Sequence, residues 1–289
     1  MRQGILIAAY KEFDHLIEVI GFFDHHFDIF IHIDKKSTPP PETLERIRAM
    51  KNVKFLASAY PVNWSGTNHL KCILLLAGEA LKNADLSYIH LISGQDFPAK
   101  DLGYFARFPQ EQGGKDFLGY FSLPSTHWSE GGLPRVEYYH FYDLLDPRKY
   151  RPWLNRIVKV QSMLHIKRRF SKKWGDLYGG STWWSLSRET LAYVIDYTRK
   201  DPSLLKRLEH TFCPDEVYFQ TVIMNSPYAQ NVVDDDLRYV DWGGSRNGSL
   251  PAVLDDTDFD KIAGSNALFA RKFQHPVSDS LRAMLTASR

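Results

Sequence analysis

The opening of the chain alternates a strand pattern with a helical one. Residues 4–9 and 28–33 are apolar runs of strand length, and residues 13–21 between them carry apolar side chains at helical spacing. A strand, a helix and a second strand in this order favour a right-handed crossover within a parallel sheet. The sequence therefore predicts an α/β fold with a mixed, mostly parallel sheet flanked by helices.

Acidic residues follow two of the predicted strands. Asp34 comes directly after residues 28–33, and Asp96 follows the buried run at residues 88–92. A single acid at such a place often forms a turn. Because ligands of open α/β sheets bind beyond the carboxyl ends of the strands, two acids on neighbouring strands indicate a site.

The stretch 211–226 carries a further acid, Glu216, behind a helix start. Pro214 suits the first helical position, and a carboxylate is favoured in the first turn by the helix dipole. A capping box is missing, since Cys213 stands where serine or threonine would be needed. Glu216 is thus a general base on a rigid element or an acid that stabilises the helix start, and this segment alone leaves both open.

The chain is predicted to form a single domain over residues 1–275, followed by a surface helix or tail at 276–289. Residues 113–175 are irregular, aromatic and basic. They are an acceptor-binding insertion or a less regular part of the core. Two distant cysteines do not form a disulfide framework and, with no signal peptide ahead of the first strand, indicate the cytoplasm.

A basic block occupies residues 148–173. No acid lies between Asp146 and Asp176, although the net charge of the chain is only +2. Such a block is a solvated helix face or meets nucleic acid, anionic lipid or an acidic acceptor. Nucleic acid is disfavoured because no nucleic-acid-binding motif accompanies the block.

A metal site is not expected. The chain has no H-E-x-x-H motif and no paired C-x-x-C motif, and Asp34 is followed by Lys35 and Lys36, which repel a cation. If a phosphate group is bound, cationic side chains must take the place of the ion. The candidates are Arg238, Arg271 and Lys272.

Seven motifs occur in the order found in one enzyme family. They are H-I-D-K-K-S (32–37), N-W-S-G (63–66), L-I-S-G-Q-D-F-P (91–98), G-G-S-T-W-W-S-L-S-R (179–188), C-P-D-E-V-Y-F-Q-T (213–221), L-R-Y-V-D-W-G (237–243) and L-F-A-R-K-F (268–273). Together they resemble the core-2/I-branching β-1,6-N-acetylglucosaminyltransferases and the peptide O-xylosyltransferases of glycosyltransferase family 14. The resemblance spans residues 5–273.

The resemblance implies a GT-A fold and inverting transfer from a UDP-sugar without a metal ion. Glu216 matches the base that deprotonates the acceptor hydroxyl, and Arg238 and Lys272 match the pair that binds the UDP pyrophosphate. Asp34 matches a residue of the nucleotide pocket. Asp96 and Trp183 match positions that line the donor sugar. The other residues of the matching motifs that are expected to bind substrate are Trp64, Asp241 and Arg271.

The resemblance also bears on the substrates. Xylosyltransferases tend to carry an acid where this chain has Thr182, so UDP-N-acetylglucosamine is expected as the donor, with UDP-xylose as the alternative. A minimal bacterial member would act on a glycan or lipid-linked saccharide, with the basic block 148–173 touching the inner membrane. Two other classes stay open, a non-catalytic nucleotide-sugar or carbohydrate-binding protein and a glycoside hydrolase that uses Asp96 with Glu216.

Overall fold

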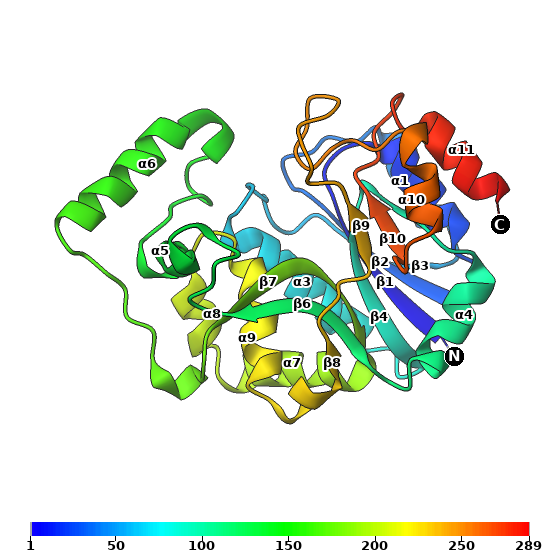
Figure 1. The fold of residues 1–289 in the computed structure, drawn as a ribbon. Helices are drawn as coiled ribbons and strands as arrows, with labels where there is room; N and C mark the ends of the chain where they lie inside the picture. The colour runs from blue at the N-terminus through cyan, green and yellow to red at the C-terminus, as the bar shows by residue number, and fades with distance from the viewer. Residues whose placement is uncertain (1, 289) are drawn as a thin grey trace.

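A seven-stranded sheet forms the centre of the computed structural model, which describes residues 2–288 (Figure 1). Its strand order is β3-β2-β1-β4-β7-β6-β8. Neighbouring strands run parallel except for β7, which is antiparallel to both β4 and β6. The strands are β1 (Arg2–Ala9), β2 (Phe27–Ile33), β3 (Val53–Ala57), β4 (Leu86–Ser93), β6 (Asp116–Ser122), β7 (Tyr178–Ser187) and β8 (Val232–Val233).

Helices cover both faces of this sheet because the side chains of each strand alternate between two apolar cores. In β1, Ile5 and Ile7 point into one core, while Leu6 points into the other. The first core is covered by α1 (Phe13–Phe22), α2 (Pro41–Ala49), α4 (Leu102–Glu111), α10 (Phe259–Ala263) and α11 (Asp279–Ala287). The second is covered by α3 (Thr67–Ala80), α7 (Arg188–Lys200), α8 (Ser203–Leu208) and α9 (Tyr218–Met224). The predicted α/β architecture, with a mixed and mostly parallel sheet flanked by helices, is confirmed.

A second sheet of three short strands lies beyond the end of β4. It has the order β5-β10-β9, with β5 (Asp96–Pro98), β9 (Arg238–Val240) and β10 (Phe269–Arg271). The antiparallel register of β5 and β10 places Arg271 opposite Asp96. Three of the seven sequence motifs therefore meet in one small sheet.

The segment between β6 and β7, residues 123–177, projects from the body and is called the arm here (Figure 1). It contains α5 (Leu133–Glu137) and α6 (Pro147–Met163). The prediction that all of 113–175 is irregular is wrong, because β6 is a strand of the main sheet and α6 is a long helix. The final residues form the predicted surface helix, α11, whose Leu281 and Leu285 are buried.

The arm is tied to the body at the start of α3. The Asp143 carboxylate accepts hydrogen bonds from the backbone N–H groups of Thr67 (2.9 Å) and Asn68 (3.2 Å), so it caps a helix that is distant in sequence. A Cβ at Gly66 would collide with this carboxylate. The glycine of the N-W-S-G motif is thus required by the close approach of the arm.

Gly179 and Gly180 lie inside β7, where a Cβ at Gly180 would collide with the Gly119 carbonyl oxygen. One local prediction needs correction. Pro214 does not begin a continuous α-helix. A single 3₁₀ turn, Pro214–Glu216, is followed by a break at Val217, and α9 begins only at Tyr218.

Candidate active site

The two acids that follow predicted strands lie at the same edge of the main sheet, although β1 separates their strands. The Asp34 N–H donates to the Ala9 carbonyl at the end of β1, and Gly94 N–H donates to the carbonyl of Ala8. Asp34 is buried, and its Oδ1 accepts the N–H groups of Lys36 (2.9 Å) and Val62 (3.0 Å). The Asp34 carboxylate therefore fixes the loop that precedes the N-W-S-G motif.

Asp96, Arg271 and Trp183 form one contiguous cluster. Asp96 is fully buried, and its carboxylate accepts hydrogen bonds from the N–H and Oγ of Ser93, both at 2.8 Å. Arg271 Nε lies 3.1 Å from Asp96 Oδ1, and the guanidinium lies 4.2 Å from the centre of a Trp183 ring. The acid thus holds the arginine, and the arginine stacks on the indole.

Lys272 follows Arg271 at the end of β10. Its Nζ lies 3.2 Å from Ser249 Oγ, in the loop 241–250 that also holds Asp241. Burial first, and the nearby Arg271 second, lower the pKa of Lys272. A cation that is partly desolvated beside another cation gains free energy when an anion binds. The Asp241 carboxylate has Arg246 Nη2 3.5 Å from its Oδ2 and accepts the N–H of Gly243 at its Oδ1 (2.8 Å).

Arg238 uses both terminal nitrogens of its guanidinium within the fold, while its buried Nε has no hydrogen-bond partner among residues 2–288. It is buried, and its Nη2 donates to the carbonyl oxygens of Leu91 (2.8 Å) and Trp184 (3.0 Å). Its Nη1 donates to the carbonyl of Asp236 (2.6 Å). The guanidinium joins the small sheet to β4 and β7, and the role of Arg238 in binding pyrophosphate remains a prediction.

Glu216 lies in the 3₁₀ turn after the left-handed residue Cys213. Cys213 N–H donates to the carbonyl of Ser65 (3.1 Å), which joins the C-P-D-E motif to the N-W-S-G motif. Arg135 Nη1, from α5 of the arm, lies 2.6 Å from Glu216 Oε2. The Glu216 side chain keeps 28% of its surface exposed, so the carboxylate is both oriented and accessible.

Asp215, the neighbour of Glu216, is buried and belongs to a second acid–base pair. Its Oδ2 lies 3.0 Å from His69 Nδ1 and accepts a hydrogen bond from Thr182 Oγ1 (2.8 Å). Burial alone would raise the pKa of Asp215, but the charge of His69 and the hydrogen bonds from His69 and Thr182 keep it below its usual value. Asp215 therefore stays ionised beside Glu216.

The environment of Glu216 favours its protonated form. Burial, followed by the negative charge of Asp215, raises the pKa of Glu216 to about 7, although Arg135 acts in the opposite direction. A base whose pKa lies near the working pH combines a substantial ionised fraction with strength as a proton acceptor. Glu216 thus has the electrostatics of a general base.

Replacing Arg135 with methionine should move the pH dependence of any reaction that uses Glu216 as a base. At pH 6 a base with a pKa of about 7 is ionised in roughly a tenth of molecules, so kcat/KM falls on the acid side. Removing the arginine removes a charge that lowers this pKa, so the acid limb of kcat/KM should shift to higher pH. Arg135→Lys keeps the charge and is the matched control; a limb that stays in place in Arg135→Met would contradict the coupling.

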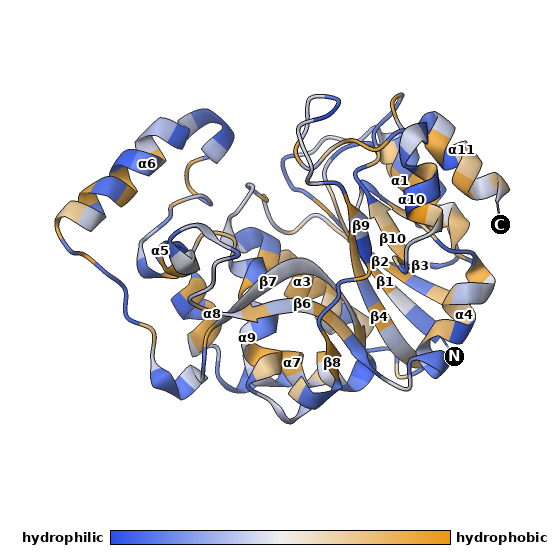
Figure 2. Ribbon diagram, viewed as in Figure 1, coloured by the Kyte–Doolittle hydropathy of each residue, from blue (hydrophilic) through white to orange (hydrophobic). Residues whose placement is uncertain are grey.

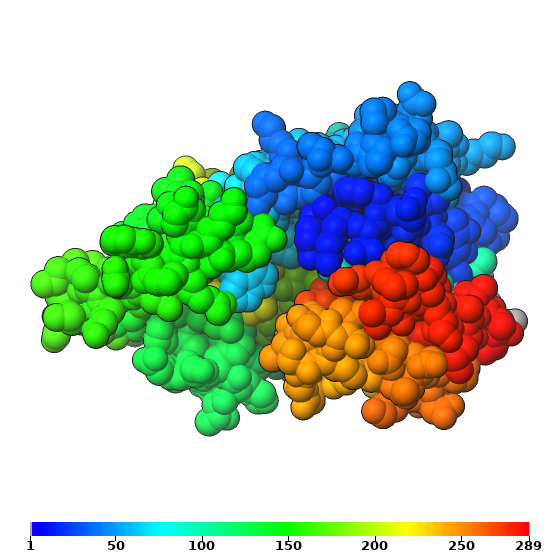
Figure 3. Space-filling model, turned by 90° about the horizontal axis from the view of Figure 1, so that it is seen from above, coloured from blue at the N-terminus to red at the C-terminus, as the bar shows by residue number. Residues whose placement is uncertain are grey.

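Trp183 and Thr182 connect the two halves of the site. Thr182 donates to Asp215, while the Trp183 ring contacts both Arg271 and His69, the latter edge-on at 6.4 Å. Trp183 therefore contacts both the arginine at the end of β10 and the histidine that holds Asp215, the neighbour of Glu216. Figure 3 shows a depression between the arm and the C-terminal part of the body.

A cavity of about 330 Å³ lies where the arm meets the body. It is lined by Trp64, which is half exposed, and by Pro147, Arg148 and Arg151 at the start of α6. The Arg151 guanidinium lies 5.9 Å from the Trp64 ring centre, and the ring of Phe212 packs edge-on against the same indole. Phe212 precedes the C-P-D-E motif, so this cavity lies next to the segment that carries Glu216.

Sequence reasoning missed Arg135 and His69 as partners of the two acids, and it did not single out Asp215. Each partner comes from an element far away in the chain, α5 or α3, and neither stands in a motif of its own. The adjacent acids Asp215 and Glu216 were the one local indication of such partners, because a buried carboxylate beside another carboxylate needs a cation to stabilise it.

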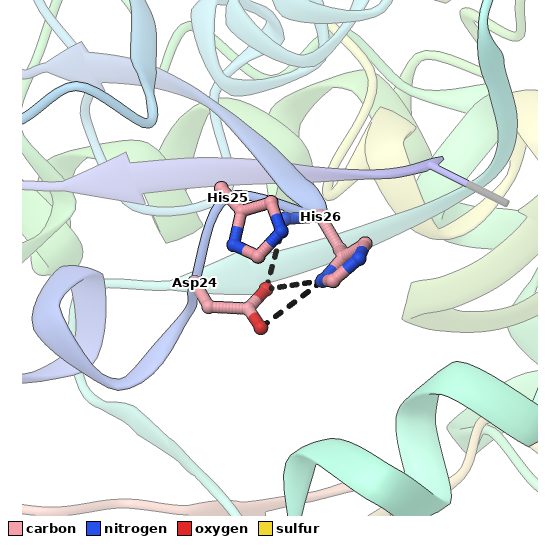
Figure 4. A group of neighbouring side chains, drawn as sticks. All are labelled: Asp24, His25 and His26. Carbon is pink, nitrogen blue, oxygen red and sulfur yellow. Dashed lines mark hydrogen bonds and ion pairs between the residues drawn. The ribbon is translucent and has the colours of Figure 1, made fainter.

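A group of potential metal ligands, Asp24, His25 and His26, lies elsewhere (Figure 4). Among residues 2–288 it is the one group of three or more His, Cys, Asp or Glu side chains with ligand atoms within 4.8 Å of one another. It precedes β2, whereas Asp34 follows it, and seven strand residues separate the two by roughly 23 Å. This group is not part of the candidate active site, and the prediction that no metal takes part remains a prediction.

The chain matches the family model "Core-2/I-Branching enzyme" over residues 6–263. It is similar to the xylosyltransferase of Ciona intestinalis, with 23% identity covering 94% of this chain and 32% of the relative. It is also similar to mouse xylosyltransferase 1, with 24% identity covering 94% of this chain and 28% of the relative. The chain thus spans about a third of the length of these relatives.

Solved structures align only loosely. TarS 1-349 of S. aureus in complex with UDP-GlcNAc aligns with a TM-score of 0.31 and 17% identity, covering 41% of this chain and 34% of that one. A putative glucose-1-phosphate thymidylyltransferase from Bacillus anthracis aligns with a TM-score of 0.35 and 12% identity, covering 81% and 85%. Within residues 2–288, no helix combines the length and the apolar character needed to cross a bilayer.

Proposed function

The chain belongs to the core-2/I-branching enzyme family of glycosyltransferases, and on that premise we propose that it is an inverting, metal-independent transferase. It would move N-acetylglucosamine from UDP-N-acetylglucosamine to a hydroxyl of a glycan acceptor and form a β-linkage. The observation that carries the proposal is a glutamate with a pKa of about 7 whose neighbour Asp215 is bonded to Thr182 and His69, next to the Trp183 ring that stacks on Arg271.

The proposed reaction is a single in-line displacement. Glu216 takes the proton of the acceptor hydroxyl while the acceptor oxygen bonds to the anomeric carbon, and the bond from that carbon to the β-phosphate oxygen of UDP breaks. The bonding electrons leave with UDP. Arg271 and Lys272 stabilise the charge that develops on the departing pyrophosphate.

The proposal that no metal is needed rests on the contacts of the acids in the site, which are already occupied by protein groups. Asp34 is occupied by two backbone N–H groups, and Lys36 Nζ lies 3.7 Å from its other oxygen. Asp96 is held by Ser93 and Arg271. Neither acid is placed as an open ligand for a cation, whereas Lys272 supplies positive charge directly.

Of the alternatives, the glycoside hydrolase fits the site poorly. A hydrolase needs two accessible carboxylates beside the bond that it cleaves. Asp96, the expected partner of Glu216, is fully buried and paired with Arg271. A non-catalytic binding protein would have no need of a glutamate whose pKa is raised to about 7 by burial.

The identity of the donor sugar has a second candidate. The curated relatives named above are xylosyltransferases, which favours UDP-xylose. The argument from Thr182 against xylose weakens, because its hydroxyl faces Asp215 and not the cluster of Arg271. UDP-xylose is therefore the competing donor.

The acceptor is proposed to be a glycan or a lipid-linked saccharide, bound in the cavity at Trp64. An exposed indole offers a stacking face for a sugar ring, and Arg148 and Arg151 offer positive charge for an anionic group. A peripheral position at the cytoplasmic face of an anionic membrane, with the basic block 148–173 toward it, is part of this proposal.

The test is thermal unfolding with a panel of nucleotides and nucleotide-sugars in the presence of EDTA. A ligand that binds only the folded state at about a hundred times its Kd adds about 2.7 kcal/mol, which for this size is a rise in Tm of about 5 °C. UDP and one UDP-sugar should produce this shift, and the sugar that does so identifies the donor. A shift that disappears with EDTA would contradict metal independence, and no shift with any uridine nucleotide would contradict the proposed donor.

A further inference from the structure

Helix α6 carries an exposed apolar ridge. Trp153, Val160 and Leu164 are 61%, 52% and 64% exposed, and their spacing of seven and four residues places them on one side of the helix. The residues that anchor α6 to the arm, Leu154 and Gln161, are buried and lie on a different side. The ridge is therefore turned to solvent and not to the protein.

A cationic row runs beside this ridge. Arg156 stands three residues after Trp153 and four before Val160, so it is a neighbour of both on the helix surface, and Lys159 directly precedes Val160. The Arg156 guanidinium lies 5.1 Å from a Trp153 ring centre. Figure 2 shows apolar and hydrophilic residues mixed along α6, where a solvated helix face would be hydrophilic throughout.

Three of the cations that follow α6 are engaged in the fold. Lys167 Nζ lies 2.6 Å from Glu137, and Lys173 lies 3.4 Å from Asp201. Arg168 donates to the carbonyl oxygens of Arg207 and Glu209. The part of block 148–173 that is available to a partner is thus mainly α6.

We propose that α6 lies flat on an anionic bilayer and inserts the ridge of Trp153, Val160 and Leu164 between the lipid headgroups. Tryptophan and leucine beside lysine and arginine are typical of helices that lie in the membrane interface. The cations select anionic lipid, because no acid lies between Asp146 and Asp176 to offset them. A second copy of the chain is a poorer occupant, since two cationic helices would repel each other.

This inference deepens the proposed membrane contact and rests on it, but it does not depend on transfer activity. The start of α6 also lines the cavity at Trp64 through Pro147, Arg148 and Arg151. A docked α6 would therefore hold this cavity at the level of the headgroups, where a lipid-linked acceptor presents its saccharide.

Co-sedimentation of the full chain with vesicles tests the proposal. Wild type should bind vesicles of phosphatidylcholine with phosphatidylglycerol at least about tenfold more tightly than vesicles of phosphatidylcholine alone. Trp153→Ser with Leu164→Ser, which leaves the charge unchanged, should weaken binding to the anionic vesicles by about tenfold or more. Met284→Ser changes an exposed apolar residue on α11 and should bind like wild type.

Three results would overturn the proposal. If the wild-type protein stays in solution with anionic vesicles, the membrane contact does not exist. If the ridge variant binds these vesicles like wild type, binding is electrostatic and the ridge does not insert. A dimer by light scattering that the ridge variant dissociates would make the ridge an interface between copies. The Tm and its shift with UDP, measured for each variant, separate these outcomes from misfolding and from failure of the proposed donor site.

Discussion

Glu216→Gln is expected to lower the rate of sugar transfer by about 10³-fold while leaving the affinity for UDP nearly unchanged. Glutamine keeps the size of the side chain and an oxygen that can accept the hydrogen bond from Arg135, but it cannot take a proton. Burial and the charge of Asp215 already make ionised Glu216 costly, so the neutral variant should be at least as stable as wild type. Initial rates of UDP release, with UDP affinity measured by calorimetry, give both quantities.

Glu216→Asp is the matched control for this prediction. It keeps a carboxylate but shortens its reach, so it should retain more activity than the glutamine variant at high pH. If Glu216→Gln keeps most of its activity, the base lies elsewhere. Asp215→Asn would then be the next substitution to measure, although this acid is buried and already bound to His69 and Thr182.

Lys272→Ala is expected to weaken UDP binding by about tenfold and transfer by about 10²-fold. The Lys272 ammonium is partly buried and lies near Arg271, and both effects lower its pKa. A bound pyrophosphate would supply the negative charge that stabilises this ammonium. Transfer should suffer more than binding, because the charge on UDP grows as the glycosidic bond breaks. The measurement is kcat and KM together with the dissociation constant of UDP.

Lys261→Ala offers the comparison, since this lysine is exposed on α10, away from the cluster around Arg271. It should behave like wild type in both assays. Equal losses in binding and transfer for Lys272→Ala would make Lys272 a binding residue without a role in the transition state. Unchanged binding would remove it from the donor site.

The fold was predictable where a helix or strand buries a regular apolar pattern. The strands β1 and β2 and the helix α1 lie within two residues of their predicted ends, because their apolar residues fill the two cores. Strand β6 was missed since Gly119 interrupts an aromatic run, and its pairing with β7 depends on the close approach at Gly180. Helix α6 was missed because Trp153, Val160 and Met163 face solvent, which breaks the apolar pattern, and because it contains Pro152.

The site was predictable as a set of residues but not as a set of contacts. Arg271 does meet both Asp96 and Trp183, and the residues beside Trp183 and Glu216, Thr182 and Asp215, are hydrogen-bonded to each other. The packing of Arg238 beneath the sheet could not be predicted, since its acceptors are carbonyl oxygens of other strands. The same holds for Arg135 and His69, whose partners are set by the path of the arm and of α3.

Because Asp143 belongs to the arm, the hydrogen bonds of two backbone N–H groups in the body depend on the position of the arm. When the arm moves away, the N–H groups of Thr67 and Asn68 lose their acceptor and become open to exchange with solvent deuterium. The same helix carries His69, which holds Asp215 beside the base. Movement of the arm is therefore expected to loosen the contact that holds Asp215, and hydrogen exchange at Thr67 and Asn68 would report it.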